Sequence, residues 1–275
     1  MKKKSNRLTT VLLVVLLLAG LSLLLYPSVS DYWNSLHQSR AIADYVESVA
    51  QLDETQYEAA WDAARVYNSA LAQGKAYDEQ EYIKQLDVSG LGIMGYVEIP
   101  TIKCSLPIYH GTDEAVLQVA IGHLSWSSLP VGGESAHCVI SGHRGLPSAK
   151  LFTDIDKLRE GDIFMLRVLD EVLTYEVDQI LIVEPDETES LMIAQGEDYC
   201  TLVTCTPYGI NTHRLLVRGH RIENIAESDS IMITAEAGQI EPMLVAPFAA
   251  MPILLVLLIA LLIPKNKRKG GNDNE

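Results

Sequence analysis

The chain has 275 residues, of which 48% are hydrophobic, and its formal net charge is −15 at pH 7. This length holds one domain of about 150–200 residues with additional segments. Eight of the 21 basic and two of the 36 acidic residues lie in the two ends, so residues 31–242 carry a net charge of −21. Such an acidic segment argues against nucleic acid as a partner, because binding phosphates requires positive charge. It either aids solubility or attracts a basic, lysine-bearing substrate.

Two uncharged apolar stretches lie near the ends, at residues 8–25 and 243–263. Each is long enough to cross the roughly 30 Å hydrocarbon layer as a helix. Basic residues flank the outer end of both, so the positive-inside rule predicts cytoplasmic tails within 1–30 and over 264–275, with an extracellular middle. The first stretch is longer than the usual ~7–15 residues of a signal core. We expect an uncleaved anchor there, with a cleaved signal peptide as the alternative.

Residues 31–92 predict a helical arm followed by a linker. Apolar residues recur at helical spacing over 36–71, which indicates one amphipathic helix. We expect its apolar face to pack on the chain's own domain, in preference to a membrane surface or a second subunit. Residues 72–92 are polar and contain Gly74, Gly90 and Gly92, which predicts a linker or flap.

Residues 93–223 predict a domain of short β-strands, followed by an acidic linker over 224–242. Seven runs have strand character and are separated by turn residues: 94–100, 102–110, 136–142, 162–169, 172–184, 199–206 and 213–223. Short helices are expected in three segments: 113–121, 148–158 and 188–195. Many short strands at close spacing suggest a β-sandwich or a closed barrel.

The last two strands form a predicted hairpin that carries a cysteine and an arginine. Pro207, Gly209 and Asn211 supply the turn between two β-branched runs. Cys205 lies where the first strand meets the turn, and antiparallel pairing would return Arg214 to its side. The guanidinium favours thiolate over thiol, and it can bind the oxyanion formed when the thiolate attacks a carbonyl. The alternative for Cys205 is a buried structural cysteine.

A third group has to protonate a leaving amine, and His143, which follows a short apolar strand, is the best candidate. Arg218 competes with Arg214, but it lies roughly 13 Å further along the same strand face. We expect Arg218 to be structural or adjacent to substrate. Arg144 points to the opposite face if the local chain is extended, so no catalytic role is assigned to it.

A reactive Cys205 must stay free, which leaves at most one disulfide among the other three cysteines: Cys104, Cys138 and Cys200. Their apolar and β-forming neighbours predict buried, inert thiols. The spacings do not match a zinc site, and no glycine-rich phosphate loop or acidic metal cluster is evident. We therefore expect no cofactor and no metal.

Three segments together resemble the sortases, the cysteine transpeptidases of Gram-positive bacterial surfaces: SGHRG (141–145), TLVTCTPYG (201–209) and HRLLVRG (213–219). Longer segments are similar to class C, the pilin-polymerising sortases: MGYVEIP (94–100), LPIYHGT (106–112), GHL (122–124), SLPVGG (128–133), GHRGLPSAKLFTDIDKL (142–158) and CTPYGINTHRLLVRG (205–219). The resemblance covers about residues 90–222. It implies a mainly β fold with a closed eight-stranded barrel and short helices. The N-terminal helical arm and the two flanking transmembrane helices are expected from the patterns described above.

The resemblance also implies roles for individual residues. Cys205 is the expected nucleophile, and His143 gives a proton to the departing amide nitrogen and then takes one from the incoming amine. Arg214, nine residues after the cysteine, is the expected oxyanion and substrate stabiliser. Thr204 is a candidate wall of the substrate groove, and His123 a structural histidine.

Class C also implies a mobile lid in which an Asp-Pro-aromatic tripeptide occupies the active site. The sequence has no Asp-Pro within 61–92, and Asp78 is the nearest substitute. We expect a site without a lid or one that closes differently.

The sequence thus predicts a membrane-anchored class C sortase with two spans and an extracellular barrel. It would cleave Leu-Pro-x-Thr-Gly-like sorting signals between Thr and Gly, and join the acyl group to a lysine of another pilin subunit. One alternative is a sortase that attaches proteins to the amine of the cell-wall peptide bridge. Another is an idle membrane scaffold that binds pilins without joining them.

Overall fold

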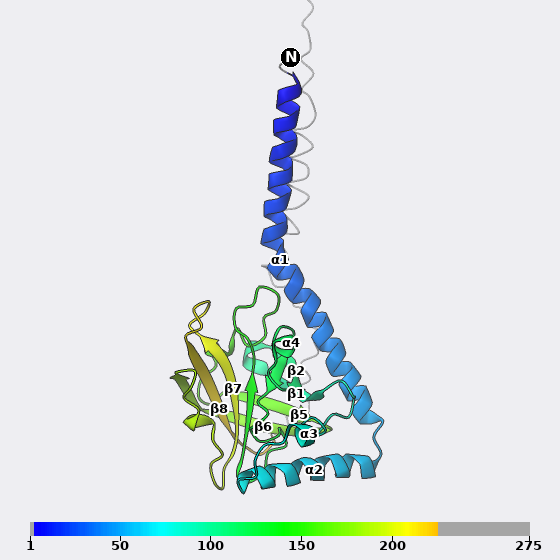
Figure 1. Ribbon diagram of the computed structural model, residues 1–275, viewed down its shortest axis with the longest axis vertical. Coiled ribbons are helices and arrows are strands. Elements are labelled where there is room, and N and C mark those ends of the chain that lie inside the picture. Colours follow the sequence, from blue (N-terminus) through cyan, green and yellow to red (C-terminus); the bar gives the residue numbers. More distant parts are fainter. Residues whose placement is uncertain (1–2, 225–275) are drawn as a thin grey trace, which may run out of the picture. The chain divides into compact units, whose positions relative to one another are not determined.

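The computed structural model describes residues 3–224 (Figure 1). Three helices come first: α1 (Lys3–Ala50), α2 (Glu54–Ala72) and α3 (Glu79–Tyr82). Strands β1 to β8 follow, and between them lie the short helix α4 (Glu114–Leu117) and three 3₁₀ turns: η1 (Pro100–Ile102), η2 (Ile155–Lys157) and η3 (Glu189–Leu191). Residues from 30 onward form one compact unit with the strands, while residues before 30 belong to another.

The eight strands close into a barrel: β1 (Ile93–Ile99), β2 (Cys104–His110), β3 (Ile121–His123), β4 (Ala136–Ser141), β5 (Ile163–Val168), β6 (Glu171–Val183), β7 (Asp198–Thr206) and β8 (His213–Arg221). Their order around the barrel is β1-β2-β3-β4-β7-β8-β6-β5. Strand β7 is the centre of the candidate site, because it pairs in parallel with β4 and antiparallel with β8. The expected closed eight-stranded barrel is confirmed.

Side chains of β7 alternate between two apolar clusters, as expected for a strand. Cys200 and Leu202 belong to the main core inside the barrel. Val203 instead packs in a smaller cluster with Leu216 of β8 and Leu191 of η3. Cys205 lies two residues beyond Val203 and therefore shares the face of the smaller cluster.

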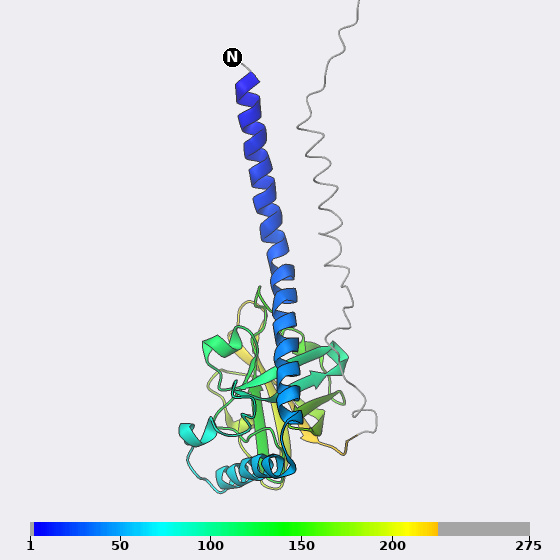
Figure 2. The ribbon, with the colours of Figure 1, turned by 90° about the vertical axis from the view of Figure 1, so that its right-hand side faces the viewer.

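The helical arm packs on the chain's own barrel, as expected. Trp61 and Ala64 of α2 are buried in the main core, and Figures 1 and 2 show α2 running across one end of the barrel. In α1 the buried Tyr45 hydroxyl donates to the Met94 carbonyl at 3.1 Å and accepts from the Leu169 amide at 2.7 Å. These bonds attach the second half of α1 to the barrel unit.

Several predicted helices differ from the structure. The single helix over 36–71 is wrong, because the chain leaves the helix after Ala50 and restarts at Glu54. Asp53 caps the new helix by accepting from the Gln56 amide, and the Gln56 side chain accepts from the Asp53 amide in return.

The three short helices predicted between strands are also shorter than expected. Only Glu114–Leu117 is helical within 113–121, and Ile121 opens strand β3, which the sequence analysis missed. The segments 148–158 and 188–195 contain only the 3₁₀ turns η2 and η3.

One stretch within residues 3–224, Thr9–Ala50, is long and apolar enough to cross a membrane. The mean hydropathy of its most apolar window is 2.5, and 6% of that window is buried. The expected second span, at 243–263, and the basic tail over 264–275 lie outside the described residues, as does most of the acidic linker.

Candidate active site

Cys205 and Arg214 face each other across the β7–β8 hairpin. The two residues are direct partners in the antiparallel register, followed by the pair Thr206 and His213. Side chains of directly opposed residues project from the same face with Cβ atoms about 4.5–5.5 Å apart. The Arg214 guanidinium donates to the His213 carbonyl at 3.1 Å and to the Asn211 carbonyl at 3.4 Å. These bonds tie the guanidinium to the turn, and the register places Arg214 across from the half-buried Cys205.

His143 lies level with Cys205 on the other side of β7. Strand β4 ends at Ser141, which pairs with Val203, and the Gly142 amide then donates to the Val203 carbonyl at 3.0 Å. Extending this register by two residues pairs position 143 with position 205, which places His143 opposite Cys205. Neighbouring strands are about 4.8 Å apart. The three predicted site residues thus come from three adjacent strands or strand ends, with Cys205 in the middle.

Thr204 does not form an exposed wall of the groove. Its side chain is 1% exposed, and its hydroxyl donates to the Gly142 carbonyl at 2.7 Å. The expected substrate contact therefore has no exposed surface in this structure. The hydroxyl instead ties β7 to the loop that carries His143.

Arg218 is held by an ion pair and a ring contact within the barrel. Its Nε and Nη2 donate to the two carboxylate oxygens of Asp178 at 3.0 and 2.8 Å, and its guanidinium lies 4.2 Å from the centre of the Tyr199 ring. A bidentate ion pair of this kind fixes the guanidinium plane. The arrangement agrees with the expected structural role and leaves Arg214 as the arginine beside the thiol.

The other three cysteines are free thiols, as is Cys205. Cys138 and Cys200 are buried partners in the β4–β7 register. Burial raises the pKa of Cys200 well above its ordinary value. Desolvation also raises the pKa of Cys104, to about 12. Cys104 and Cys200 are therefore poor nucleophiles at neutral pH, because the thiolate is the reactive form.

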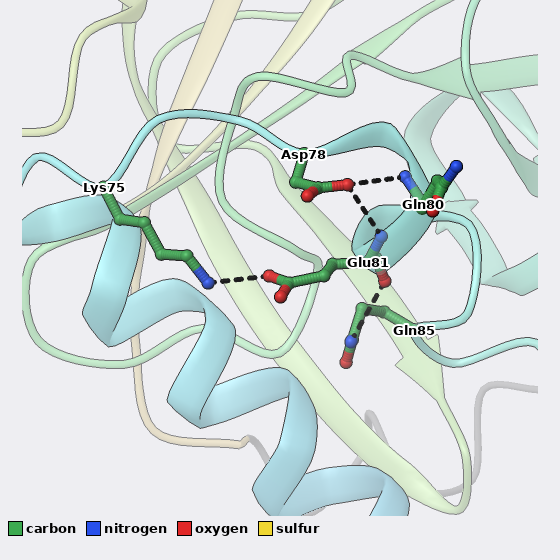
Figure 3. A network of polar contacts seen from close by, with 5 residues as sticks. All are labelled: Lys75, Asp78, Gln80, Glu81 and Gln85. Atoms are coloured by element: carbon green, nitrogen blue, oxygen red, sulfur yellow. Dashed lines mark hydrogen bonds and ion pairs between the residues drawn. The ribbon is translucent and has the colours of Figure 1, made fainter.

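Residues 72–92, where class C implies a lid, have their own local structure. Figure 3 shows Asp78 accepting from the amides of Gln80 and Glu81, so this carboxylate caps helix α3. Lys75 pairs with Glu81 at 2.7 Å. Among the described contacts of Asp78, none joins it to Cys205 or Arg214.

Helix α3 ends in a buried tyrosine that holds the structural histidine. The Tyr82 hydroxyl lies 3.0 Å from His123 Nδ1 and accepts from the Gly111 amide at 3.0 Å. His123 is fully buried, and its Nε2 lies 2.8 Å from the Ser128 carbonyl. The expected structural placement of His123 is confirmed.

Within residues 3–224, no group of three or more His, Cys, Asp or Glu side chains is placed to hold a metal ion. The arrangement that remains is a cysteine with a histidine and an arginine level with it on the two neighbouring strands or strand ends of a closed β-barrel. A cation beside a thiol favours the thiolate, and an imidazole can move the protons of acyl transfer. Fold and site together define a cysteine enzyme of acyl transfer.

Comparisons with known proteins agree with this class. The sequence model of the Sortase domain family matches residues 97–222. Among solved structures, sortase C1 from Streptococcus agalactiae is 51% identical over 68% of this chain and 100% of that chain, with a TM-score of 0.66. Sortase C from Streptococcus pneumoniae, studied for its pilin substrate specificity, is 47% identical over 67% of this chain and 97% of its own, with a TM-score of 0.60.

Two further relatives bear on function. Clostridium perfringens sortase C, solved with the C-terminal cell wall sorting motif, is 44% identical over 67% of this chain and 99% of its own, with a TM-score of 0.61. Sortase D from Bacillus subtilis is 32% identical over 131 residues, which are 46% of this chain and 63% of that protein. The chain belongs to the sortase family of cysteine transpeptidases, and its solved neighbours place it in class C.

Proposed function

We propose that the chain is a membrane-anchored transpeptidase that joins pilin subunits, with Cys205 as its nucleophile. The observation that carries the proposal is the pairing of Cys205 with Arg214, level with His143. The substrate class is supported by two relatives: the Clostridium perfringens structure with a sorting motif and the Streptococcus pneumoniae enzyme with its pilin specificity. The bond cleaved would lie between Thr and Gly of a Leu-Pro-x-Thr-Gly-like signal.

In the first half-reaction the Cys205 thiolate attacks the carbonyl carbon of the signal's threonine. The new S–C bond places negative charge on the carbonyl oxygen, which the Arg214 guanidinium stabilises. His143 gives its proton to the amide nitrogen as the C–N bond breaks. The fragment that begins with Gly leaves as an amine, and the thioester remains on Cys205.

In the second half-reaction a lysine amine of another pilin subunit attacks the thioester. The amine gives its proton to His143, the S–C bond breaks, and an isopeptide bond forms. The thiolate and the imidazolium are both restored. Because the thioester keeps the acyl group activated, no nucleotide is consumed.

Arg214 suits the oxyanion role because its charge is not already paired within the described residues. Its described bonds go to backbone carbonyls, whereas Arg218 is bound to both carboxylate oxygens of Asp178. The carboxylate of Glu184 contacts the neighbouring His213 instead, whose Nε2 lies 3.2 Å from it. A guanidinium without a carboxylate partner retains donors for a substrate oxygen.

The membrane part of the proposal rests on the apolar N-terminal half of α1. We propose that this segment is an uncleaved anchor, that 243–263 forms a second span, and that the barrel is extracellular with both termini in the cytoplasm. Determining the N-terminal sequence of the mature protein distinguishes the anchor from a cleaved signal peptide.

The accepted amine is tested by offering one acceptor at a time. The full-length protein in detergent is mixed with a Leu-Pro-Glu-Thr-Gly peptide and either a lysine-bearing pilin domain or an oligoglycine amine, with Cys205→Ala as the control. The proposal predicts a Cys205-dependent lysine adduct that lacks the glycine fragment. Transfer to oligoglycine alone would instead support wall anchoring. A protein with an alkylatable Cys205 that gives neither cleavage nor adduct with any pilin sorting signal would support the scaffold.

A further inference from the structure

The residue after His143 contacts the strand that carries Cys205. Arg144 is 10% exposed in its side chain, and its Nη1 donates to the Thr206 hydroxyl at 3.2 Å. Its Nη2 is paired with the Asp156 carboxylate. Its guanidinium also lies 5.8 Å from the centre of the Tyr208 ring. Arg144 thus joins the end of β7, the following turn and η2, which contains Asp156.

Two side-chain hydrogen bonds bracket the pair formed by His143 and Cys205. The first runs from the Thr204 hydroxyl to the Gly142 carbonyl, one residue before the pair. The second runs from Arg144 to Thr206, one residue after it. Both continue the β4–β7 register beyond the last backbone pair. In β7 the side chains of Thr204 and Thr206 lie on the face opposite Cys205, because successive side chains of a strand alternate.

Stability alone is a poor explanation for this arginine. Burying a guanidinium removes its hydration, and an ion pair offsets that loss only when the remaining donors are satisfied. Among the described residues, the buried Nε of Arg144 has no hydrogen-bond partner. The Nε donor of Arg144 is therefore left unsatisfied, while the guanidinium keeps its contacts with Thr206 of β7 and with Asp156.

We propose that Arg144 is a positioning residue that holds His143 beside Cys205 through Thr206 and Asp156. The inference rests on the roles proposed above for the thiol and the imidazole. Without the guanidinium, the bond from Thr204 to the Gly142 carbonyl is the one side-chain hydrogen bond between the loop that carries His143 and β7 that remains among residues 3–224. A misplacement of about 1 Å in a catalytic pair costs on the order of 10²-fold in rate.

The test uses the full-length protein in detergent with the variants Arg144→Ala, Arg144→Lys, Thr206→Val and Thr206→Ser. Two readouts are the kcat and KM of sorting-peptide cleavage and the rate of Cys205 alkylation by iodoacetamide at neutral pH. The second needs no sorting signal, so it separates this inference from the pilin function. Arg218→Ala is the matched control, because Arg218 also pairs with an aspartate and lies over a tyrosine ring.

For Arg144→Ala we expect a fall in kcat on the order of 10²-fold with KM within about twofold, and alkylation slower by about tenfold. For Thr206→Val we expect kcat and the alkylation rate to fall as well. For Thr206→Ser, which keeps the hydroxyl oxygen, we expect both to stay near those of the wild type. Arg144→Lys lies between wild type and Arg144→Ala, since one ammonium does not reproduce the planar fork.

Three results would overturn the inference. One is a kcat for Arg144→Ala that matches that of Arg218→Ala. Another is a rise in KM at unchanged kcat, which would indicate a substrate contact. The third is equal activity of Thr206→Val and Thr206→Ser. The melting temperature of each variant is measured alongside, and Thr206→Val provides a near-isosteric variant if Arg144→Ala fails to fold.

Discussion

Cys205 and Arg214 are directly opposed partners in the antiparallel pair of β7 and β8. This relationship places the two side chains on the same face of the hairpin without a register shift in the ladder. Replacing Arg214 with lysine keeps the charge but removes the planar fork of donors. For Arg214→Lys we expect kcat of sorting-peptide cleavage to fall by about 10²–10³-fold, as for the loss of an oxyanion donor.

The measurement is steady-state cleavage of a Leu-Pro-Glu-Thr-Gly peptide, with Arg218→Lys as the control on the same strand face. Arg218→Lys should keep a kcat near that of the wild type, because its guanidinium is bound to Asp178 and not presented to the thiol. Equal losses in the two variants would contradict the assignment of Arg214.

The Thr204 hydroxyl should contribute to stability. Thr204→Val removes the donor and leaves the Gly142 carbonyl, itself buried, without this partner. Such a loss costs about 1–3 kcal/mol of unfolding free energy. Urea unfolding of Thr204→Val and Thr204→Ser compares the two cases, since serine keeps the oxygen. A valine variant as stable as the serine variant would show that the bond contributes nothing.

His137 makes stability depend on pH. The ring is 1% exposed, and its Nδ1 lies 2.9 Å from the Met192 carbonyl, an acceptor, so Nδ1 carries the hydrogen. The Nε2 then accepts from the Thr201 hydroxyl at 2.7 Å. Burial lowers the pKa of His137 below its ordinary value, against the opposing effect of the Met192 carbonyl. The native protein therefore keeps the ring neutral where the unfolded chain protonates it.

The sign of the effect follows from this difference. Below the ordinary histidine pKa of about 6.5 the unfolded state binds more protons, so stability falls as pH drops. Each such histidine changes the free energy of unfolding by at most about 1.36 kcal/mol per pH unit. Urea unfolding between about pH 7.5 and about pH 5.5 should show a smaller loss for His137→Gln than for wild type. Equal slopes would mean that His137 titrates alike in both states.

Tyr45 should anchor the second half of α1. Its buried hydroxyl serves both the Met94 carbonyl and the Leu169 amide. Tyr45→Phe leaves that amide without this acceptor and costs about 1–3 kcal/mol of unfolding free energy. Tyr57→Phe is the control, because the Tyr57 hydroxyl makes an exposed contact of 3.5 Å to Glu171. Thermal unfolding of both variants tests the difference, and a smaller shift for Tyr45→Phe would contradict it.

The hairpin that carries Cys205 and Arg214 was predictable, because local composition and turn residues specify both its strands and its register. The observed strands, Asp198–Thr206 and His213–Arg221, begin and end within two residues of the predicted ranges. Barrel closure was not predictable from periodicity. It depends on the pairing of β1 with β5, as between Tyr96 and Arg167, which lie far apart in sequence.

The differences from expectation have local causes. Strand β3 has three residues and contains a glycine, so it carries too little pattern to recognise, although it pairs with both β2 and β4. The break between α1 and α2 depends on the cap formed by Asp53 and Gln56, and helical periodicity continues on either side of it.

The contact of Arg144 with Thr206 was missed because strand alternation gives the face of a side chain but not its partner. The parallel register of β4 and β7 pairs residues 62 apart, from Ala136 with Asp198 to Ser141 with Val203, and the contact of Arg144 with Thr206 continues it. Only the structure gives this register.

The most direct test of the account is the mass of the acyl-enzyme. The full-length protein in detergent is incubated with a Leu-Pro-Glu-Thr-Gly peptide without an acceptor amine, quenched in acid and digested. If Cys205 forms the thioester, the one peptide that contains Cys205 gains the mass of the sorting peptide less the released glycine fragment, and Cys205→Ala shows no gain. An acyl adduct that persists in Cys205→Ala, or cleavage that proceeds in that variant, would contradict a thioester on Cys205.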